Sequence, residues 1–440
     1  MAVATPETRD RRQRIARRIL LALALAGGAL ACKAPAVRPN VVFVLVDTLR
    51  KDHLGLYGYP LRTSETIDAL GRGGWVFEKH IAHASQTVPS TLSMMLSRLP
   101  VDHGFAHRRI RQFSDRPPRF PDEFLFLTEV FREAGYATAA AVGNRFLSHK
   151  TGFSQGFEFF FQAKVGDKLT AASLRWLEAR RTREDERPVF LYVHYVDAHY
   201  PYVDPKEHPD RVATPASGRL LFGNGLVADI AEADLAFTRA SYDAGVATVD
   251  DEISKLVAYL EERGIFEDTI FVVTSDHGEE FDEHGGLGHG TTVYGEQVRI
   301  PLVVSHPREL EAGRRITRPT QHLDLAPTLL RWAGIPVPEA FRGQDLLGEE
   351  RPILADNGVW RAVHAGSRKL ILNTETGEEV VYALDDELDR SPVEGPVASD
   401  LREALAAYLQ QEDAGGTGPS SAEEWSEEEK EQLRALGYLE

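Results

Sequence analysis

The stretch Val41-Val42-Phe43-Val44-Leu45-Val46 is apolar at every position, and Asp47 follows it at once. An unbroken run rich in β-branched residues is typical of a strand that is covered on both faces, as in a parallel sheet. A second run at 270–274 has the same character and leads into Asp276 and His277. The two runs therefore predict a parallel sheet with acidic residues at the carboxyl ends of its strands.

Further apolar runs alternate along the chain with segments that have helical periodicity. The order strand, helix, strand predicts an α/β fold with a doubly wound, mostly parallel sheet. Beyond about residue 336 the segments become shorter and alternate in polarity, which predicts a small C-terminal antiparallel subdomain. The further predicted strands lie at 75–77, 137–142, 190–193 and 301–304, and the longest predicted helix lies at 241–263.

The first 32 residues have the order of an export signal, with arginines at 9–18 before an apolar run at 19–25. The ending Ala29-Leu30-Ala31-Cys32 resembles a bacterial lipoprotein cleavage box, so we expect an exported envelope protein that is lipid-anchored at Cys32. Cleavage without a lipid and an uncleaved anchor are the alternatives. The predicted regions are an export signal at 1–32, a main α/β domain at 38–336, a C-terminal subdomain at 337–412, and a linker with an acidic helical tail at 413–440.

The charge and the cysteine content restrict the chemistry. With 67 acidic and 50 basic residues, the chain has a formal net charge of -17. It has no basic stripe outside the export signal, so a nucleic acid is not an expected partner. Cys32 is the only cysteine, which excludes an internal disulfide framework and a thiolate metal cluster. Carboxylates, histidines or hydroxyls must therefore hold any metal ion.

Acidic residues and a histidine gather at the predicted carboxyl edge of the sheet, where ligands bind in open α/β folds. Asp47 ends one predicted strand, and Asp276 with His277 ends another, so the fold brings these distant residues together. Each of them alone is more often structural or solvated than functional. Their combination suits a hard or borderline divalent cation.

Thr87 is the candidate nucleophile. It stands in Thr87-Val88-Pro89-Ser90, ahead of a helical stretch at 91–96, and Pro89 is compatible with a first helical turn. Unpaired N–H groups at a helix N-terminus stabilise an alkoxide or an anionic ester group. A threonine that merely caps the helix is the alternative, and this segment taken alone favours it.

Histidines in loops complete the set of candidate residues. His194 and His199 flank Asp197 directly after a predicted strand, and His284 and His289 lie in a glycine-rich segment. One loop histidine is more often structural, but several at one sheet edge are difficult to assign to packing.

These blocks together resemble the sulfatase branch of the alkaline phosphatase superfamily over residues 39–334. The resemblance implies an alkaline-phosphatase-like fold in which Asp47, Asp276 and His277 hold one divalent metal ion. Thr87 is implied to be both a further ligand and the nucleophile. The motifs that carry the resemblance are Arg38-Pro39-Asn40, Val46-Asp47-Thr48-Leu49-Arg50, Thr87-Val88-Pro89-Ser90, 195–201, Thr274-Ser275-Asp276-His277-Gly278-Glu279, Gly288-His289-Gly290, Arg299-Ile300-Pro301-Leu302 and 321–328.

The resemblance also assigns residues to the substrate. It implies that His199 and His289 contact the anionic group or the leaving oxygen of an ester. Asn144 and Arg145 stand where typical members have a lysine-bearing loop, and we expect them to contact the substrate. His194 is a further candidate for a substrate contact, or else it orients a metal ligand. One imidazole among oxygen ligands favours zinc or manganese, with calcium as the alternative.

The chain also departs from typical sulfatases. Those enzymes have a cysteine or serine that matures to formylglycine, with an arginine four residues later, whereas this chain has Thr87 and Thr91. Thr48 also stands where typical members have a second aspartate. Threonine cannot mature to formylglycine, and a threonine nucleophile is similar to that of phosphoethanolamine transferases and lipoteichoic-acid synthases in the same superfamily.

Three functions stay open. The leading hypothesis is a metal-dependent, sulfatase-like hydrolase of sulfuric or phosphoric ester bonds, phosphodiesters included, with Thr87 as nucleophile. The alternatives are a phosphoryl-group transferase acting on an envelope lipid or glycan, and an inactive cell-surface binding protein. The expected partners are a small-molecule, glycan or lipid ester and a membrane reached through the N-terminal segment.

Overall fold

The computed structural model describes residues 38–106, 118–223, 225–227, 229–306, 310–413, 420–421, 426–427 and 430. The predicted export signal, Cys32 and most of the predicted tail at 413–440 lie outside these residues. None of the described helices combines the length and the apolar character that crossing a lipid bilayer requires.

The predicted sheet is present, and within the described residues it has eight strands in the order β12-β2-β11-β8-β1-β6-β4-β5. β1 lies between β8 and β6 and is parallel to both. β11 runs antiparallel to its neighbours β2 and β8. The strands are β1 (Asn40–Val46), β2 (Trp75–Ile81), β4 (Ala137–Val142), β5 (Phe159–Gln162), β6 (Val189–Tyr195), β8 (Thr269–Thr274), β11 (Arg299–Ser305) and β12 (Arg314–Gln321).

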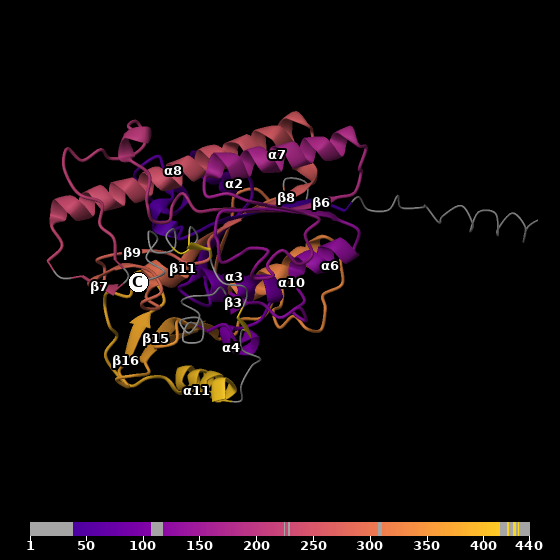
Figure 1. Cartoon of the computed structure of the whole chain (residues 1–440). Helices are drawn as coiled ribbons and strands as arrows, with labels where there is room; N and C mark the ends of the chain where they lie inside the picture. Colours follow the sequence, from indigo (N-terminus) through magenta and orange to yellow (C-terminus); the bar gives the residue numbers. More distant parts are fainter. Residues whose placement is uncertain are drawn as a thin grey trace, which may run out of the picture. The chain divides into compact units, whose positions relative to one another are not determined.

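The two faces of the sheet are covered by different helices (Figure 1). Successive side chains of a strand point to opposite faces. In β1, Val41, Phe43 and Leu45 pack in a core with α3, α6 and α10, whereas Val42 and its alternate neighbours pack with α2, α7 and α8. This explains why β1 is apolar at every position. The helices are α2 (Glu65–Gly73), α3 (Thr87–Leu96), α4 (Pro100–His103), α6 (Leu127–Glu133), α7 (Gly166–Thr182), α8 (Glu232–Glu262), α9 (Gly295–Val298) and α10 (Leu325–Trp332).

Helix α8 differs most from the sequence prediction in extent, and strand β11 differs in direction. Helix α8 begins at Glu232 rather than at 241, because its first turns carry few buried apolar residues and so lack the periodic signal. Acidic residues in the first turn, Glu232 and Asp234, favour a helix start there. The strand predicted at 301–304 is the antiparallel β11, a direction that the apolar pattern does not encode.

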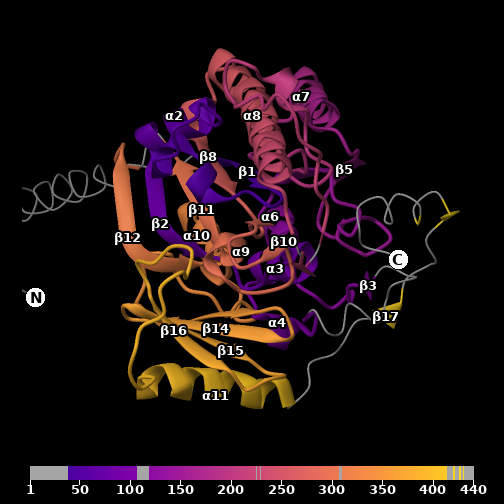
Figure 2. The same ribbon diagram turned by 90° about the vertical axis from the view of Figure 1, so that its left-hand side faces the viewer.

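The C-terminal part forms the predicted antiparallel sheet, a four-stranded meander with helix α11 (Ser399–Asp413) along one face (Figure 2). The other face packs against residues 293–298, next to the central sheet. On β15, Lys369 is fully buried, pairs with Asp389, and donates a hydrogen bond to the carbonyl of Val293 at 2.8 Å. The strands are β13 (Ile353–Asp356), β14 (Trp360–Ala365), β15 (Arg368–Asn373) and β16 (Glu379–Ala383).

A third sheet of short strands lies in the loops around the carboxyl edge. β10 (Gly286–Gly288) pairs antiparallel with β7 (Gly225–Leu226) and with β9 (Glu280–Phe281). This small sheet joins the glycine-rich loop to the segment that follows β6. The remaining pair, β3 (Pro118–Arg119) with β17 (Ser420–Ser421), is antiparallel.

Candidate metal and catalytic centre

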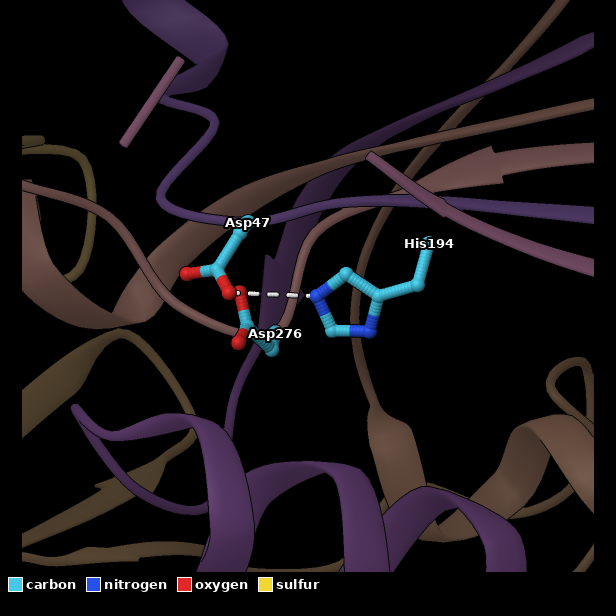
Figure 3. A group of neighbouring side chains, drawn as sticks. All are labelled: Asp47, His194 and Asp276. Carbon is cyan, nitrogen blue, oxygen red and sulfur yellow. Dashed lines mark hydrogen bonds and ion pairs between the residues drawn. The ribbon is translucent and has the colours of Figure 1, made fainter. Parts of the chain in front are cut away.

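Three adjacent strands bring the predicted site residues to one edge of the sheet. Leu45 of β1 pairs with His194 of β6 and with Thr274 of β8, so Asp47 and Asp276 emerge side by side. Figure 3 shows the carboxylates of Asp47 and Asp276 with the imidazole of His194 directed at them. The prediction that the fold would join residues so distant in sequence therefore agrees with the structure.

Asp47 is fully buried, and its two carboxylate oxygens have different surroundings. Oδ2 accepts hydrogen bonds from Asn144 Nδ2 at 2.8 Å and from His194 Nε2 at 3.1 Å. Oδ1 has no hydrogen-bond partner among the described residues. Burial alone raises the pKa of Asp47, but the His194 hydrogen bond and the charge of His199 outweigh it and hold this pKa well below its usual range. Asp47 is therefore an anion with one unused oxygen.

The ring of His194 is held in one tautomer. Burial, together with the charges of Asp276 and Asp47, raises the pKa of Tyr192 well above its usual value, so its hydroxyl stays protonated. His194 Nε2 lies 3.1 Å from the anionic carboxylate of Asp47, which can only accept, so Nε2 carries a proton. In the neutral imidazole Nδ1 is then an acceptor, and the Tyr192 hydroxyl, 3.0 Å away, donates to it. Both ring nitrogens thus have partners within the protein, and the predicted contact of His194 with the substrate stays a prediction. The alternative prediction, that His194 orients a metal ligand, fits it.

Asp276 is the second buried carboxylate of the site. Its Oδ1 accepts the backbone N–H groups of His277 at 2.9 Å and Thr48 at 3.2 Å, whereas Oδ2 has no partner among the described residues. Thr48 has a φ of 61°, an uncommon conformation for a β-branched residue. This left-handed turn points the Thr48 N–H at Asp276. Burial, and then repulsion by Asp47, raise the pKa of Asp276.

His277 carries its proton on the other ring nitrogen from His194. Its Nδ1 lies 2.9 Å from the carbonyl of Gly278 and donates to it, so Nε2 carries a lone pair. Nε2 lies 3.4 Å from Asp276 Oδ2 and 3.8 Å from Asp47 Oδ1, the two oxygens without partners. A histidine that gives its other N–H to a backbone carbonyl is typical of metal ligands. The convergence of this lone pair with two unsatisfied carboxylate oxygens fits a divalent cation.

Thr87 faces the same point from the first turn of α3. Gln86 occupies the N-cap position of this helix, so the interpretation of Thr87 as its cap is wrong. The Oγ1 atom of Thr87 lies 3.4 Å from His277 Nε2 and 3.4 Å from Asn144 Nδ2. The hydroxyl therefore stands beside the candidate metal ligands and at the positive end of a helix dipole.

Asn144 and Arg145 follow β4. Asn144 bridges Asp47 and Thr87 through its amide and is nearly buried. That amide is occupied by protein atoms, so Asn144 holds the nucleophile candidate and the carboxylate in place. Arg145 is half-buried next to it, and its predicted contact with the substrate stays a prediction.

His199 and His289 lie next to each other, and His289 also lies against His277. Their ring centres are 5.0 Å apart, and the ring of His289 is 4.4 Å from that of His277. His289 Nδ1 lies 2.8 Å from a carboxylate oxygen of Glu279. Burial lowers the pKa of His289, but the charge and hydrogen bond of Glu279 outweigh burial and raise it.

Glu279 and Tyr192 are site residues to which sequence reasoning assigned no role. Glu279 follows His277 by two residues within a recognised motif, but only the fold shows that it reaches His289. Tyr192 lies inside an apolar strand and has the pattern of a core residue. Alternation along the strand was the available signal, because Tyr192 and His194 face the same side of β6.

A second group of possible metal ligands contains Glu280, His284 and Glu296. His284 Nδ1 lies 2.9 Å from Glu296 Oε1, and Nε2 lies 3.2 Å from the carbonyl of Asp389. Burial lowers the pKa of His284, but the Glu296 carboxylate raises it above its ordinary value. A protonated His284 that donates through both nitrogens accounts for this geometry without an ion.

Comparison with known proteins identifies the family. The family model described as Sulfatase matches residues 39–335, and the chain therefore belongs to the sulfatase family. This family is part of the alkaline phosphatase superfamily, and its members hydrolyse sulfate esters. The family predicted from the motifs is confirmed.

Individual relatives are distant. Human arylsulfatase A is 29% identical over 398 residues, which cover 77% of this chain and 71% of that protein. The multifunctional alkaline phosphatase superfamily protein PehA of Trinickia caryophylli is 29% identical over 233 residues, 44% of this chain and 42% of that protein. The phosphonate monoester hydrolase of Agrobacterium radiobacter matches with a TM-score of 0.66 at 19% identity, covering 88% of this chain and 100% of the other. This structural likeness confirms the α/β fold.

Proposed function

We propose that this protein is a metal-dependent hydrolase of sulfuric or phosphoric ester bonds that uses Thr87 as its nucleophile. The observation that carries the proposal is the convergence of Thr87 Oγ1 with His277 Nε2, 3.4 Å apart, beside the unsatisfied oxygens of Asp47 and Asp276. A hydroxyl in that position can attack a tetrahedral sulfur or phosphorus centre whose charge the site offsets.

In this proposal Asp47, Asp276 and His277 hold one divalent cation, with Thr87 as a further ligand. An imidazole among oxygen ligands favours zinc or manganese, with calcium as the alternative. The ion would lower the pKa of the Thr87 hydroxyl and offset negative charge on the transferred group.

Different residues of the chain act as nucleophile, as stabilisers of the anionic oxygens and as proton donor. Thr87, whose hydroxyl pKa the ion would lower, loses its proton to solvent water, and its Oγ1 forms a bond to sulfur or phosphorus while the bond to the leaving oxygen breaks. N–H groups at the start of α3 stabilise the anionic oxygens. His289, whose pKa Glu279 raises, or its neighbour His199 gives a proton to the leaving oxygen. A water oxygen then forms a bond to sulfur or phosphorus, the bond to Thr87 Oγ1 breaks, and one proton of that water passes to Oγ1 and regenerates the hydroxyl.

The test is hydrolysis by purified protein without residues 1–32. The substrates are an aryl sulfate, a phosphate monoester and a phosphodiester, each assayed with added zinc, manganese or calcium. We expect turnover of at least one ester, and we expect Thr87→Val to lower kcat by a factor on the order of a thousand or more. Thr91→Val is the matched control, because Thr91 is a buried threonine of the same helix whose hydroxyl has no hydrogen-bond partner among the described residues.

Two results would overturn this function. Equal activity of the Thr87→Val and Thr91→Val proteins would show that Thr87 is not the nucleophile. Product analysis in which an added alcohol captures the transferred group in place of water would support the transferase instead. Export and lipid attachment at Cys32 are a separate proposal from the sequence, which mass spectrometry of the mature N-terminus tests.

A further inference from the structure

Two contacts join the glycine-rich segment around His289 to the C-terminal subdomain. Before His289 in the chain, His284 Nε2 lies 3.2 Å from the carbonyl of Asp389, in the loop after β16. After it, the Gly290 carbonyl accepts the side-chain amide of Asn357, which follows β13, at 3.4 Å. His289 therefore lies between two points at which the subdomain contacts its loop.

The segment has few side chains of its own with which to pack. Four of the six residues from 285 to 290 are glycines. Gly285, Gly288 and Gly290 have φ values of 83°, 85° and 75°, which only glycine adopts freely. Besides the pairing of β10 with β7 and β9, the position of the segment therefore depends on the contacts at its two ends.

The ring of His284 donates hydrogen bonds through both nitrogens. Nδ1 lies 2.9 Å from Glu296 Oε1, and Nε2 faces the Asp389 carbonyl. A carboxylate and a carbonyl can only accept, so each nitrogen must carry a proton, and a neutral imidazole would lose one of the two bonds. The ring also stacks on Tyr294, with the centres 3.7 Å apart and the planes 6° apart. The two hydrogen bonds together therefore require the charged form of His284.

Acidic groups surround this ring. Glu296 is 1% exposed, and Glu280 accepts the backbone N–H of His284 at 3.1 Å. The two nearest cations are engaged by the buried Asp389 carboxylate, which offsets their charge. The arrangement therefore favours an imidazolium at this position. The titratable and charged groups that face the ring or its acceptors are Glu280, Glu296, Tyr294, Asp389, Lys369 and Arg299.

We propose that charged His284 is a positioning residue, which joins the glycine-rich segment to the C-terminal subdomain and thereby keeps His289 in place beside His277. The contact is lost when His284 loses its charge as the pH rises. The consequence for catalysis rests on the proposed function, in which His289 gives a proton to the leaving oxygen. The contact between the two parts of the chain does not rest on it.

Urea unfolding of the full-length protein tests the contact without any substrate. Burial lowers the pKa of His284, but the hydrogen bond and charge of Glu296 outweigh burial and raise it above the ordinary value. The folded protein then binds this proton more tightly than the unfolded chain, whose histidines have a pKa of about 6.5. The stabilisation is therefore full below about pH 6.5 and is lost as the pH rises through the folded value.

Three proteins are compared in this unfolding experiment, the unmodified chain, His284→Gln and His284→Lys. The urea midpoint of the unmodified protein should exceed that of His284→Gln most at about pH 6.5, and the difference should shrink as the pH rises. His284→Lys should lack this decline, because lysine keeps its charge to about pH 10. Parallel pH dependences of the unmodified and His284→Gln proteins would overturn the proposal.

The catalytic consequence is measured as kcat for an ester that the unmodified protein hydrolyses. We expect His284→Gln to lower kcat about tenfold to a hundredfold, the effect of a small displacement of a catalytic group. The kcat of His284→Lys divided by that of the unmodified protein should rise with pH, since His289 is the same in both. His208→Gln is the matched control, because His208 is a half-buried histidine whose Nε2 contacts Thr248 of α8, at 2.8 Å, rather than the glycine-rich segment.

The two experiments separate failure of this proposal from failure of the proposed function. If no ester is hydrolysed by any of these proteins, the proposed function fails, and the unfolding comparison still decides whether charged His284 makes the contact. If esters are hydrolysed and His284→Gln has the same kcat as His208→Gln, the contact does not position His289 and the proposal is wrong.

Discussion

Two histidines beside Asp47 carry their protons on opposite nitrogens, and this difference sets their roles. The Nδ1–H of His277 donates a hydrogen bond to a backbone carbonyl, and the lone pair on its Nε2 faces the carboxylates. His194 accepts at Nδ1 from Tyr192 and presents a proton to Asp47. Both are fully buried and next to the same carboxylates, so residue type and location alone would not tell a metal ligand from a residue that positions one.

The Tyr192 hydroxyl is expected to support metal binding without touching the ion. Tyr192→Phe removes the donor that keeps the His194 proton on Nε2. The hydrogen bond from His194 to Asp47 therefore weakens, and the carboxylate is positioned less firmly. We expect the affinity for zinc to fall about tenfold to a hundredfold, the usual effect of losing such a partner. Competition with a chromogenic chelator measures this affinity.

The control for this substitution is Tyr136→Phe. Tyr136 is also a buried tyrosine, and its hydroxyl donates to the backbone carbonyl of Pro39 at 3.0 Å rather than to a site residue. A zinc affinity that is unchanged in Tyr192→Phe, or lowered equally in both proteins, would contradict the role given to Tyr192.

Helix α8 is shaped to let the loop after β6 pass close to it. Gly245 lies in the middle of this helix, where glycine costs about 1 kcal/mol relative to alanine. A Cβ atom at Gly245 would lie 2.2 Å from the carbonyl oxygen of Asp197. The glycine therefore permits a close contact between helix and loop, and this contact helps to set the position of His199 two residues later.

Gly245→Ala is expected to lower stability by about 1–3 kcal/mol, because backbone atoms must shift to make room. It should also lower kcat, since the shift occurs at the loop that carries His199. Urea unfolding and ester hydrolysis measure the two effects. Gly73→Ala in α2 is the control, because a Cβ there meets no atom of the described residues within 4 Å, and we expect it to be neutral or slightly stabilising. Equal behaviour of the two variants would refute the close-contact argument.

Several buried histidines that must stay neutral connect the stability of the protein to pH. Burial lowers the pKa of His80 to about 3, of His83 to about 4 and of His103 to about 3. In the unfolded chain a histidine has a pKa of about 6.5, so below that pH the unfolded state binds more protons than the folded state. Stability is therefore full above about pH 6.5 and falls as the pH drops toward the folded values.

Each of these histidines should contribute a loss of up to about 1.4 kcal/mol per pH unit in that window. Urea unfolding at several pH values between 4.5 and 7.5 checks this expectation. His80→Gln should reduce the slope by the share of one histidine, whereas His149→Gln at an exposed site should not. A stability that is flat across this range would show that these histidines do not control acid unfolding.

Much of the architecture was readable from local pattern. The apolar runs at β1, β4, β6 and β8 predicted buried parallel strands, because a strand covered on both faces has no polar side to alternate with. Asp47, Asp276, His277 and Thr87 were identified from motifs, and the structure brings all four together. The direction of β11 and the true start of α8 were not predicted, because neither leaves a periodic signal.

The fold alone set the partners and orientations of the site residues. Proton positions on His194 and His277 depend on Tyr192 and on a backbone carbonyl, and the pKa of His289 depends on Glu279. A linear sequence conveys which chemical groups are present and how regularly they recur, whereas tautomers, charge states and pocket walls arise from atoms that meet only when distant segments pack together.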